Sequence, residues 1–140
     1  MADDPKNPPR GAGLELSTAP VALHAFGNRS GPRAPRLSDF NLSSEQELVG
    51  PEKAPLPMGA STVSDPEAVD GLSGHYHVLD AGTPLPEGLG VVKDDQESVP
   101  NSTNPRTHHT IFPSRAMPFR EFQRLFVSLP WRHCGKKERE

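Results

Sequence analysis

Thr107-His-His-Thr-Ile-Phe-Pro-Ser-Arg-Ala-Met-Pro-Phe-Arg-Glu-Phe122 is the stretch in which a strand pattern passes through a short turn into a helix pattern. Residues 107–112 combine β-branched and aromatic side chains, which favours a strand. Two adjacent histidines, His108 and His109, lie in this strand. Because polar side chains on a strand beside a helix start often build a site, we expect the chemistry of the protein in this region.

The helix is predicted from the residue spacing after Pro118. Proline suits the first helical position, where its missing N–H costs no hydrogen bond. Apolar side chains then recur at spacings of three, four and three residues, which draws one stripe along a helix. They are Phe119, Phe122, Phe126 and Leu129, and Pro130 ends the pattern. A stripe of this kind is far more often core than a cofactor site, so we expect it to be core.

Residues 75–93 contribute two more predicted strands. His75–Leu79 has strand composition, and Leu89–Lys93 is a second apolar run. Two prolines and two glycines fall within Gly82–Gly88, which makes the connection between these strands tight and non-helical. Three strands and one helix predict a small domain of the α+β class.

The first half of the chain is poor in apolar side chains. Hydrophobic residues make up 33% of the sequence, below the roughly 45–50% of globular domains. Val21–Phe26 could form a first strand, and Gly59–Val63 is a short strand-like run. We expect a Pro-rich, poorly ordered and largely irregular segment over residues 1–57, a folded domain over 58–131 and a charged tail over 132–140.

Charge is distributed unevenly. Residues 1–105 carry a net charge of −8, and residues 106–140 carry +5. A basic end can attract phosphates, although self-neutralisation against the acidic part is the alternative interpretation. The last five residues, Lys136 to Glu140, mix both signs, which does not favour a nucleic-acid partner.

The number of cysteines and the hydropathy exclude several classes of protein. Cys134 is the single cysteine, which leaves no disulfide framework and no Cys-based metal cluster. No apolar run approaches the roughly 18 residues of a membrane span, and the acidic N-terminus has no signal-peptide pattern. We expect a cytoplasmic protein without a membrane partner, and secretion through a machine that reads no N-terminal signal stays open.

Histidines and hydroxyls are the candidate site residues. His108 and His109 point to opposite faces of a strand, so one can face a core or cleft while the other faces water. A histidine in a cleft can hydrogen-bond a ribose or act as an acid or base. Ser61 and Thr62 can hydrogen-bond a sugar or an amide. A zinc site from His108 with two histidines of residues 75–79 lacks a carboxylate or thiolate ligand, so we expect no metal.

Three segments, in order, carry a family resemblance: Gly59-Ala-Ser-Thr-Val63, Asp80-Ala-Gly-Thr-Pro-Leu-Pro-Glu-Gly-Leu89, and Thr107 to Met117. Together they resemble the "Tse-two" cytotoxic effectors of type VI secretion, whose relatives occur in bacteria and fungi. The resemblance covers roughly residues 59–129. It implies an ADP-ribosyltransferase-toxin-like fold of antiparallel strands with a C-terminal amphipathic helix, acting with NAD as substrate inside a target cell.

The resemblance also implies site residues. The family's strand histidine corresponds to His108, and its Gly-Thr-Ser corresponds to Gly59, Ala60 and Ser61, so one threonine hydroxyl is replaced by alanine. His24 stands where family members carry an arginine toward the NAD phosphates. On this basis His108 and Ser61 are the expected catalytic residues.

The expected NAD-binding residues are His24, Thr62, Arg106 and Arg115, with Arg106 or Arg115 near phosphate. Two functions remain open at this point. The first is transfer of ADP-ribose to an unknown macromolecular acceptor, or hydrolysis of NAD, with an immunity or antitoxin protein as a further partner. The second is a divergent, inactive toxin fold that serves as an interaction module. The retained Ser61 and His108 favour the enzyme, and the missing arginine and threonine favour the module.

Overall fold

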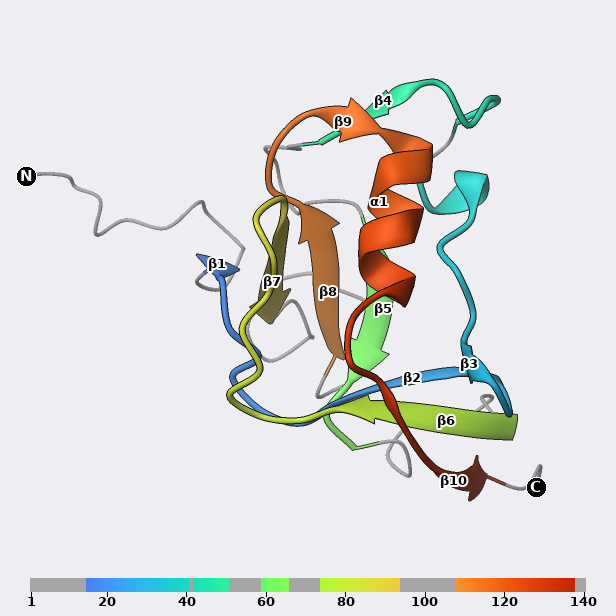
Figure 1. Ribbon diagram of the computed structural model, residues 1–140, viewed down its shortest axis with the longest axis vertical. Coiled ribbons are helices and arrows are strands. Elements are labelled where there is room, and N and C mark those ends of the chain that lie inside the picture. Colours follow the sequence, from blue (N-terminus) through green and yellow to red (C-terminus); the bar gives the residue numbers. More distant parts are fainter. Residues whose placement is uncertain (1–14, 41, 51–58, 66–73, 94–107, 138–140) are drawn as a thin grey trace, which may run out of the picture.

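The computed structural model describes residues 15–40, 42–50, 59–65, 74–93 and 108–137, and Figure 1 shows their arrangement. Every strand pair among these residues is antiparallel. The large sheet has the order β1-β7-β8-β5-β2-β6-β10, with β3 paired to β2. Its strands are β1 (Glu15–Leu16), β2 (Leu23–Asn28), β3 (Gly31–Pro32), β5 (Ala60–Val63), β6 (Gly74–Leu79), β7 (Leu89–Lys93), β8 (His108–Pro113) and β10 (Arg132–Lys137).

A small sheet and two helices complete the described fold. β4 (Leu48–Val49) pairs with β9 (Met117–Pro118), and β9 leads directly into helix α1 (Phe119–Val127). A short 3-10 helix, η1 (Leu37–Asp39), lies between β3 and β4. The α+β class predicted from the sequence is therefore confirmed.

The large sheet consists of two halves that meet at one residue pair. β5 pairs with β8 over four residue pairs, and β2 pairs with β6 over five. Between β2 and β5, in contrast, the ladder holds the single pair His24 with Val63. The two halves therefore differ in orientation. In Figure 1 the axes of β7, β8 and β5 are nearly vertical, while β2 and β6 cross below them.

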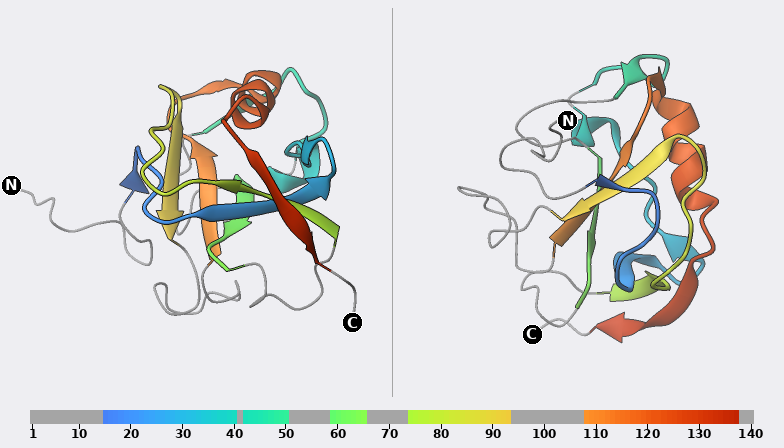
Figure 2. Two further views of the ribbon diagram at one scale, coloured as in Figure 1. Left: turned by 60° about the horizontal axis from the view of Figure 1, so that its bottom comes forward. Right: turned by 90° about the vertical axis from the view of Figure 1, so that its left-hand side faces the viewer.

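Helix α1 covers one face of this sheet, as both views in Figure 2 show. Its stripe side chains Phe119, Phe122 and Phe126 are buried, and Leu129 is buried just beyond the helix end. They pack in one apolar cluster with residues from both sheet halves, among them Leu23, Leu79, Val91 and Ile111. The predicted core stripe is therefore confirmed. Pro118 differs slightly from the prediction, since it caps the helix in an extended conformation and Phe119 is the first helical residue.

Residues before position 57 contribute to this core. The strand predicted at 21–26 is β2, which lies between β5 and β6, and its Leu23 side chain is completely buried. Phe40 and Val49 join the same cluster. The large sheet thus takes strands from both sides of the boundary that the sequence predicts at residue 57. Apolar content alone understates this segment, because the side chains of Ala19, Leu23, Ala25, Phe40 and Val49 are all buried in the core cluster.

The segment expected as a charged tail also forms structure. Residues 132–137 are β10, paired with β6 from Arg132 opposite Val78 to Lys137 opposite Gly74. An edge strand needs backbone pairing more than apolar side chains, and charged residues on an edge are common.

Neither helix among the described residues is long and apolar enough to span a membrane.

Removal of the Leu23 side chain tests whether the domain includes β2. Leu23 is 0% exposed, so Leu23→Ala should lower the free energy of unfolding by about 2–5 kcal/mol, as buried leucine truncations do. Val21→Ala is the matched control, because Val21 is 39% exposed and should change stability by no more than about 0.5 kcal/mol. Chemical denaturation measures both. Equal, small effects would mean that the folded domain begins after residue 57.

Candidate active site

A cavity of about 390 Å³ opens where β2 and β5 diverge. One wall comes from the two strands, a second from the segment after β3, and Phe126 of helix α1 contributes from the core side. Such a volume lies within the range of small-molecule sites. The lining residues are His24, Ala25, Phe26, Arg33, Ala34, Pro35, Arg36, Asp39, Ala60, Ser61, Thr62, Val63, His108 and Phe126.

Four residues predicted from the sequence line this one cavity: His24, Ser61, Thr62 and His108. They come from three strands and lie up to 84 positions apart in the chain. Strand pairing explains how they meet. Val63 is opposite His24 on one side and opposite His108 on the other, so the three residues form one row across the sheet. Residues directly opposite share a face, which puts both imidazoles on the same face with Cα atoms about 10 Å apart, two strand spacings.

The His24 ring also holds the two sheet halves together. Its Nδ1 atom lies 3.1 Å from the Val63 carbonyl oxygen. Because a carbonyl only accepts, Nδ1 carries the proton in this contact. The ring meets Tyr76 edge-on, at 5.8 Å between centroids. His24 therefore fixes the apex of the cavity, the point at which β2 and β5 meet.

The two hydroxyls differ in their surroundings. Thr62 is buried, and its Oγ1 donates to the His109 carbonyl oxygen at 3.0 Å. That bond ties β5 to β8 beyond the regular ladder. Ser61 is exposed at the cavity wall. Of the two, Ser61 has the hydroxyl more accessible to a ligand.

The two histidines of β8 lie on opposite faces of the strand, as predicted. His109 lies two positions from Ile111 of the main core and so shares its face, while His108 lies on the face of Val63 and lines the cavity. The expectation that one of the two faces water is wrong, because His108 is 7% and His109 4% exposed. All six residues of β8 are buried, and β5 and β7 pair with its two edges.

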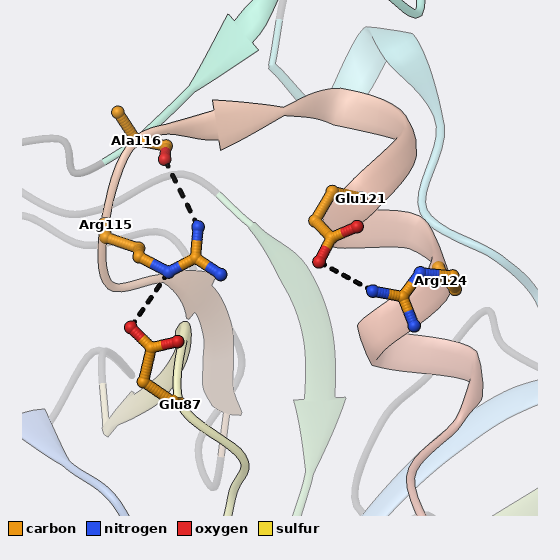
Figure 3. Close-up of polar contacts among 5 residues, drawn as sticks. All are labelled: Glu87, Arg115, Ala116, Glu121 and Arg124. Carbon is orange, nitrogen blue, oxygen red and sulfur yellow. Dashed lines mark hydrogen bonds and ion pairs between the residues drawn. The ribbon is translucent and has the colours of Figure 1, made fainter.

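Of the two arginines expected near phosphate, Arg115 is the one that the structure describes, and it does not line the cavity. Arg115 follows β8, and its Nε donates to Glu87 at 2.9 Å while a second nitrogen reaches the Ala116 carbonyl oxygen (Figure 3). It is not among the cavity-lining residues. Figure 3 also shows Arg124 bonded to Glu121 on helix α1, and this hydrogen bond lowers the pKa of the Glu121 carboxyl. Arg106 lies outside the described residues.

Two other arginines, Arg33 and Arg36, line the cavity instead. Sequence reasoning missed them because residues 28–57 show no apolar periodicity that would place a side chain on a face. The available signal was local: Gly27 and Gly31 flank a short turn, which returns the chain across the end of β2 as β3. Asp39 lines the cavity as well and gives the wall one carboxylate beside two guanidinium groups.

The histidines of β6, His75 and His77, lie beside His133 of β10 and not beside His108 as a zinc site would require. His75 Nδ1 lies 3.0 Å from His133 Nε2 of β10, and the His77 ring meets the His133 ring edge-on. Desolvation and, secondarily, the nearby His133 lower the pKa of His75. Within the residues that the structure describes, no group of three or more His, Cys, Asp or Glu side chains could hold a metal ion.

Substitution of His24 tests its role at the apex. His24→Phe keeps a ring but removes the donor to the Val63 carbonyl, which should cost about 1–3 kcal/mol of unfolding free energy because a partly buried acceptor loses its partner. His24→Asn is the matched variant, because its amide N–H₂ can donate from a similar position, so it should lose less. Urea denaturation compares the three proteins. Equal stability of wild type and His24→Phe would contradict the role of this bond.

Comparison with protein families matches residues 6–130 to the family described as Tse2 ADP-ribosyltransferase toxin. No curated protein and no solved structure matches the chain. The match covers most of the chain and includes helix α1, the residues that line the cavity and every strand of both sheet halves except β10. The predicted resemblance is thereby confirmed, and the chain belongs to the Tse2 ADP-ribosyltransferase toxin family.

Proposed function

We propose that the chain is a toxin enzyme that cleaves NAD in the cavity between β2 and β5, transferring ADP-ribose to a macromolecular acceptor or to water. The observation that carries the proposal is the convergence of His24, Ser61, Thr62 and His108 on one cavity in a chain of this family. Imidazole and hydroxyl groups are suited to hydrogen-bond ribose hydroxyls and a carboxamide. The cavity size fits a part of a dinucleotide better than a macromolecule.

The reaction that we propose breaks one bond and forms one. The N-glycosidic bond between nicotinamide and C1′ of its ribose breaks, and its electron pair leaves with the nicotinamide nitrogen. An oxygen or nitrogen of the acceptor, or water, attacks C1′ and loses a proton. Between the two events positive charge develops on the ribosyl ring. A site that orients the ribose and excludes competing geometries lowers this barrier.

The cavity residues divide between the two ends of the bond that breaks. His108, almost completely buried in β8, is positioned to hold ribose hydroxyls in one orientation. Ser61, exposed at the wall, has the role of orienting the nicotinamide side in this proposal. His24 and Thr62 contact the chain itself, at Val63 and His109, and so shape the cavity as well as line it.

The wider biology follows the same proposal. The toxin acts in the cytoplasm of a target cell after delivery by a type VI-like route, and an immunity protein protects the producing cell. The rival function is an interaction module that keeps the fold without the chemistry. Ala60 and His24, where the family resemblance leads one to expect threonine and arginine, are the observations that favour this rival.

Incubation with NAD and measurement of released nicotinamide separates enzyme from module. Wild type should release nicotinamide. His108→Ala should lower the rate about 100-fold, the scale of losing orientation at a reacting group, with little change in melting temperature. His109→Ala, on the core face of the same strand, should act on the melting temperature more than on the rate. No release by folded wild type would support the module, and inactivation by His109→Ala alone would exchange the assigned roles.

A further inference from the structure

The segment after β3 forms a strap across one side of the cavity, defined here as residues 33–40. At its start the Arg33 N–H donates to the Phe26 carbonyl oxygen at 3.0 Å, which anchors the strap to β2. The approach is close: a Cβ added to Gly27 would lie 2.4 Å from the Gly31 carbonyl oxygen and 2.5 Å from the Arg33 nitrogen. Any side chain at position 27 would therefore push the strap away from the strand.

Helix α1 holds the strap from the other side. Gln123 Nε2 donates to the Pro35 carbonyl oxygen at 2.8 Å, midway between the two arginines. At the far end, the Phe40 ring packs edge-on against Phe119 and Phe122, at 5.8 and 5.3 Å between centroids. The strap is thus fixed at its start, at its middle and at its end, which gives its side chains defined positions at the cavity.

The strap brings positive charge to the cavity. Arg33 and Arg36 both line it and both are exposed, so their guanidinium groups are accessible to a ligand. Asp39 is the one carboxylate of the strap, and its Oδ2 accepts the Arg36 N–H at 2.8 Å while Oδ1 lies 3.7 Å from the Arg36 guanidinium. The aspartate is therefore used in holding η1 and Arg36, and the strap keeps a net charge of +1 at the cavity.

We propose that Arg33 and Arg36 bind the diphosphate of the dinucleotide, and that Gln123 is a positioning residue that holds them at the cavity. This inference rests on the proposed function and deepens it. The planar guanidinium group is the side chain best suited to phosphate oxygens, through paired N–H donors. Strand β2 itself carries no arginine or lysine, and the Nδ1 atom of its His24 already bonds the Val63 carbonyl oxygen. The phosphate contact therefore comes from the strap. A dinucleotide then lies with its diphosphate under the strap and its nicotinamide ribose toward Ser61 and His108.

Calorimetric titration with ligands that differ in phosphate tests the proposal. ADP-ribose contains the diphosphate and cannot release nicotinamide, while adenosine and nicotinamide lack phosphate. Arg33→Ala and Arg36→Ala should each weaken ADP-ribose binding about 10-fold to 100-fold, as expected for lost hydrogen bonds to a charged group. Arg29→Ala is the matched control, because it removes the same charge from the same region outside the cavity lining. Binding of adenosine and nicotinamide should be the same in all variants.

Gln123→Met tests the positioning role separately, because methionine keeps the length of the side chain but cannot donate to Pro35. Gln123→Met should weaken the binding of ADP-ribose severalfold and leave the binding of adenosine and nicotinamide unchanged. A general loss of stability would weaken the binding of all three ligands.

The outcomes distinguish this inference from the function on which it rests. If wild type binds ADP-ribose and both arginine variants bind it as tightly as Arg29→Ala does, the strap is not the phosphate site, and the proposed function stands with other phosphate contacts. If Arg33→Ala weakens binding but Gln123→Met does not, the positioning role is wrong. If folded wild type binds neither ADP-ribose nor NAD, both the inference and the proposed function fail.

Discussion

The pairing of His24 with Val63 joins the two halves of the large sheet, and the arrangement of the site depends on it. A continuous ladder between β2 and β5 would bring their backbones together along their length and close the cavity. A single pair, reinforced by the His24 ring at 3.1 Å from the Val63 carbonyl oxygen, lets the strands meet and then diverge. The same row continues to His108 in β8. One point of contact therefore sets both the opening and the placement of two candidate site residues.

Helix α1 has two roles that its sequence pattern shows only in part. Its apolar stripe closes the core over both sheet halves, with Phe126 reaching the cavity. Its polar face is usually interpreted as a solvent face. Here, however, Gln123 of that face contacts the Pro35 carbonyl oxygen, and Arg120 bonds Glu45 before β4. The helix thereby organises the segment between β3 and β4, which carries Arg33 and Arg36.

Local patterns were sufficient to predict much of the fold. Strand composition predicts β2, β5, β6, β7 and β8 within one or two residues, and apolar spacing predicts the helix and its buried side. These elements carry the signal in consecutive residues, so no knowledge of distant contacts is needed. From the family resemblance and from side-chain chemistry we name His24, Ser61, Thr62 and His108 as candidate site residues, and all four line the cavity.

What the sequence did not reveal depends on long-range contacts. β10 is charged and gains its structure from backbone pairing with β6, some sixty positions earlier. The strap follows no helical or strand period, and its place at the cavity depends on Gln123, 88 positions beyond Pro35. We expect Arg115 near phosphate from the sequence, but the turn after β8 carries its side chain to Glu87 instead. In each case position along the chain was a poor guide to position in space.

The most direct test of an NAD site between β2 and β5 is a nuclear magnetic resonance titration that follows the backbone amide chemical shifts as ADP-ribose is added. If the divergence of β2 and β5 is the NAD site, the largest shift changes should fall on Ala25, Arg33, Ser61 and His108, on both strands and the strap. The β6–β10 edge near His75 and His133 should remain unchanged and serves as the internal control. Shift changes confined to that edge, or no changes at all, would contradict the account.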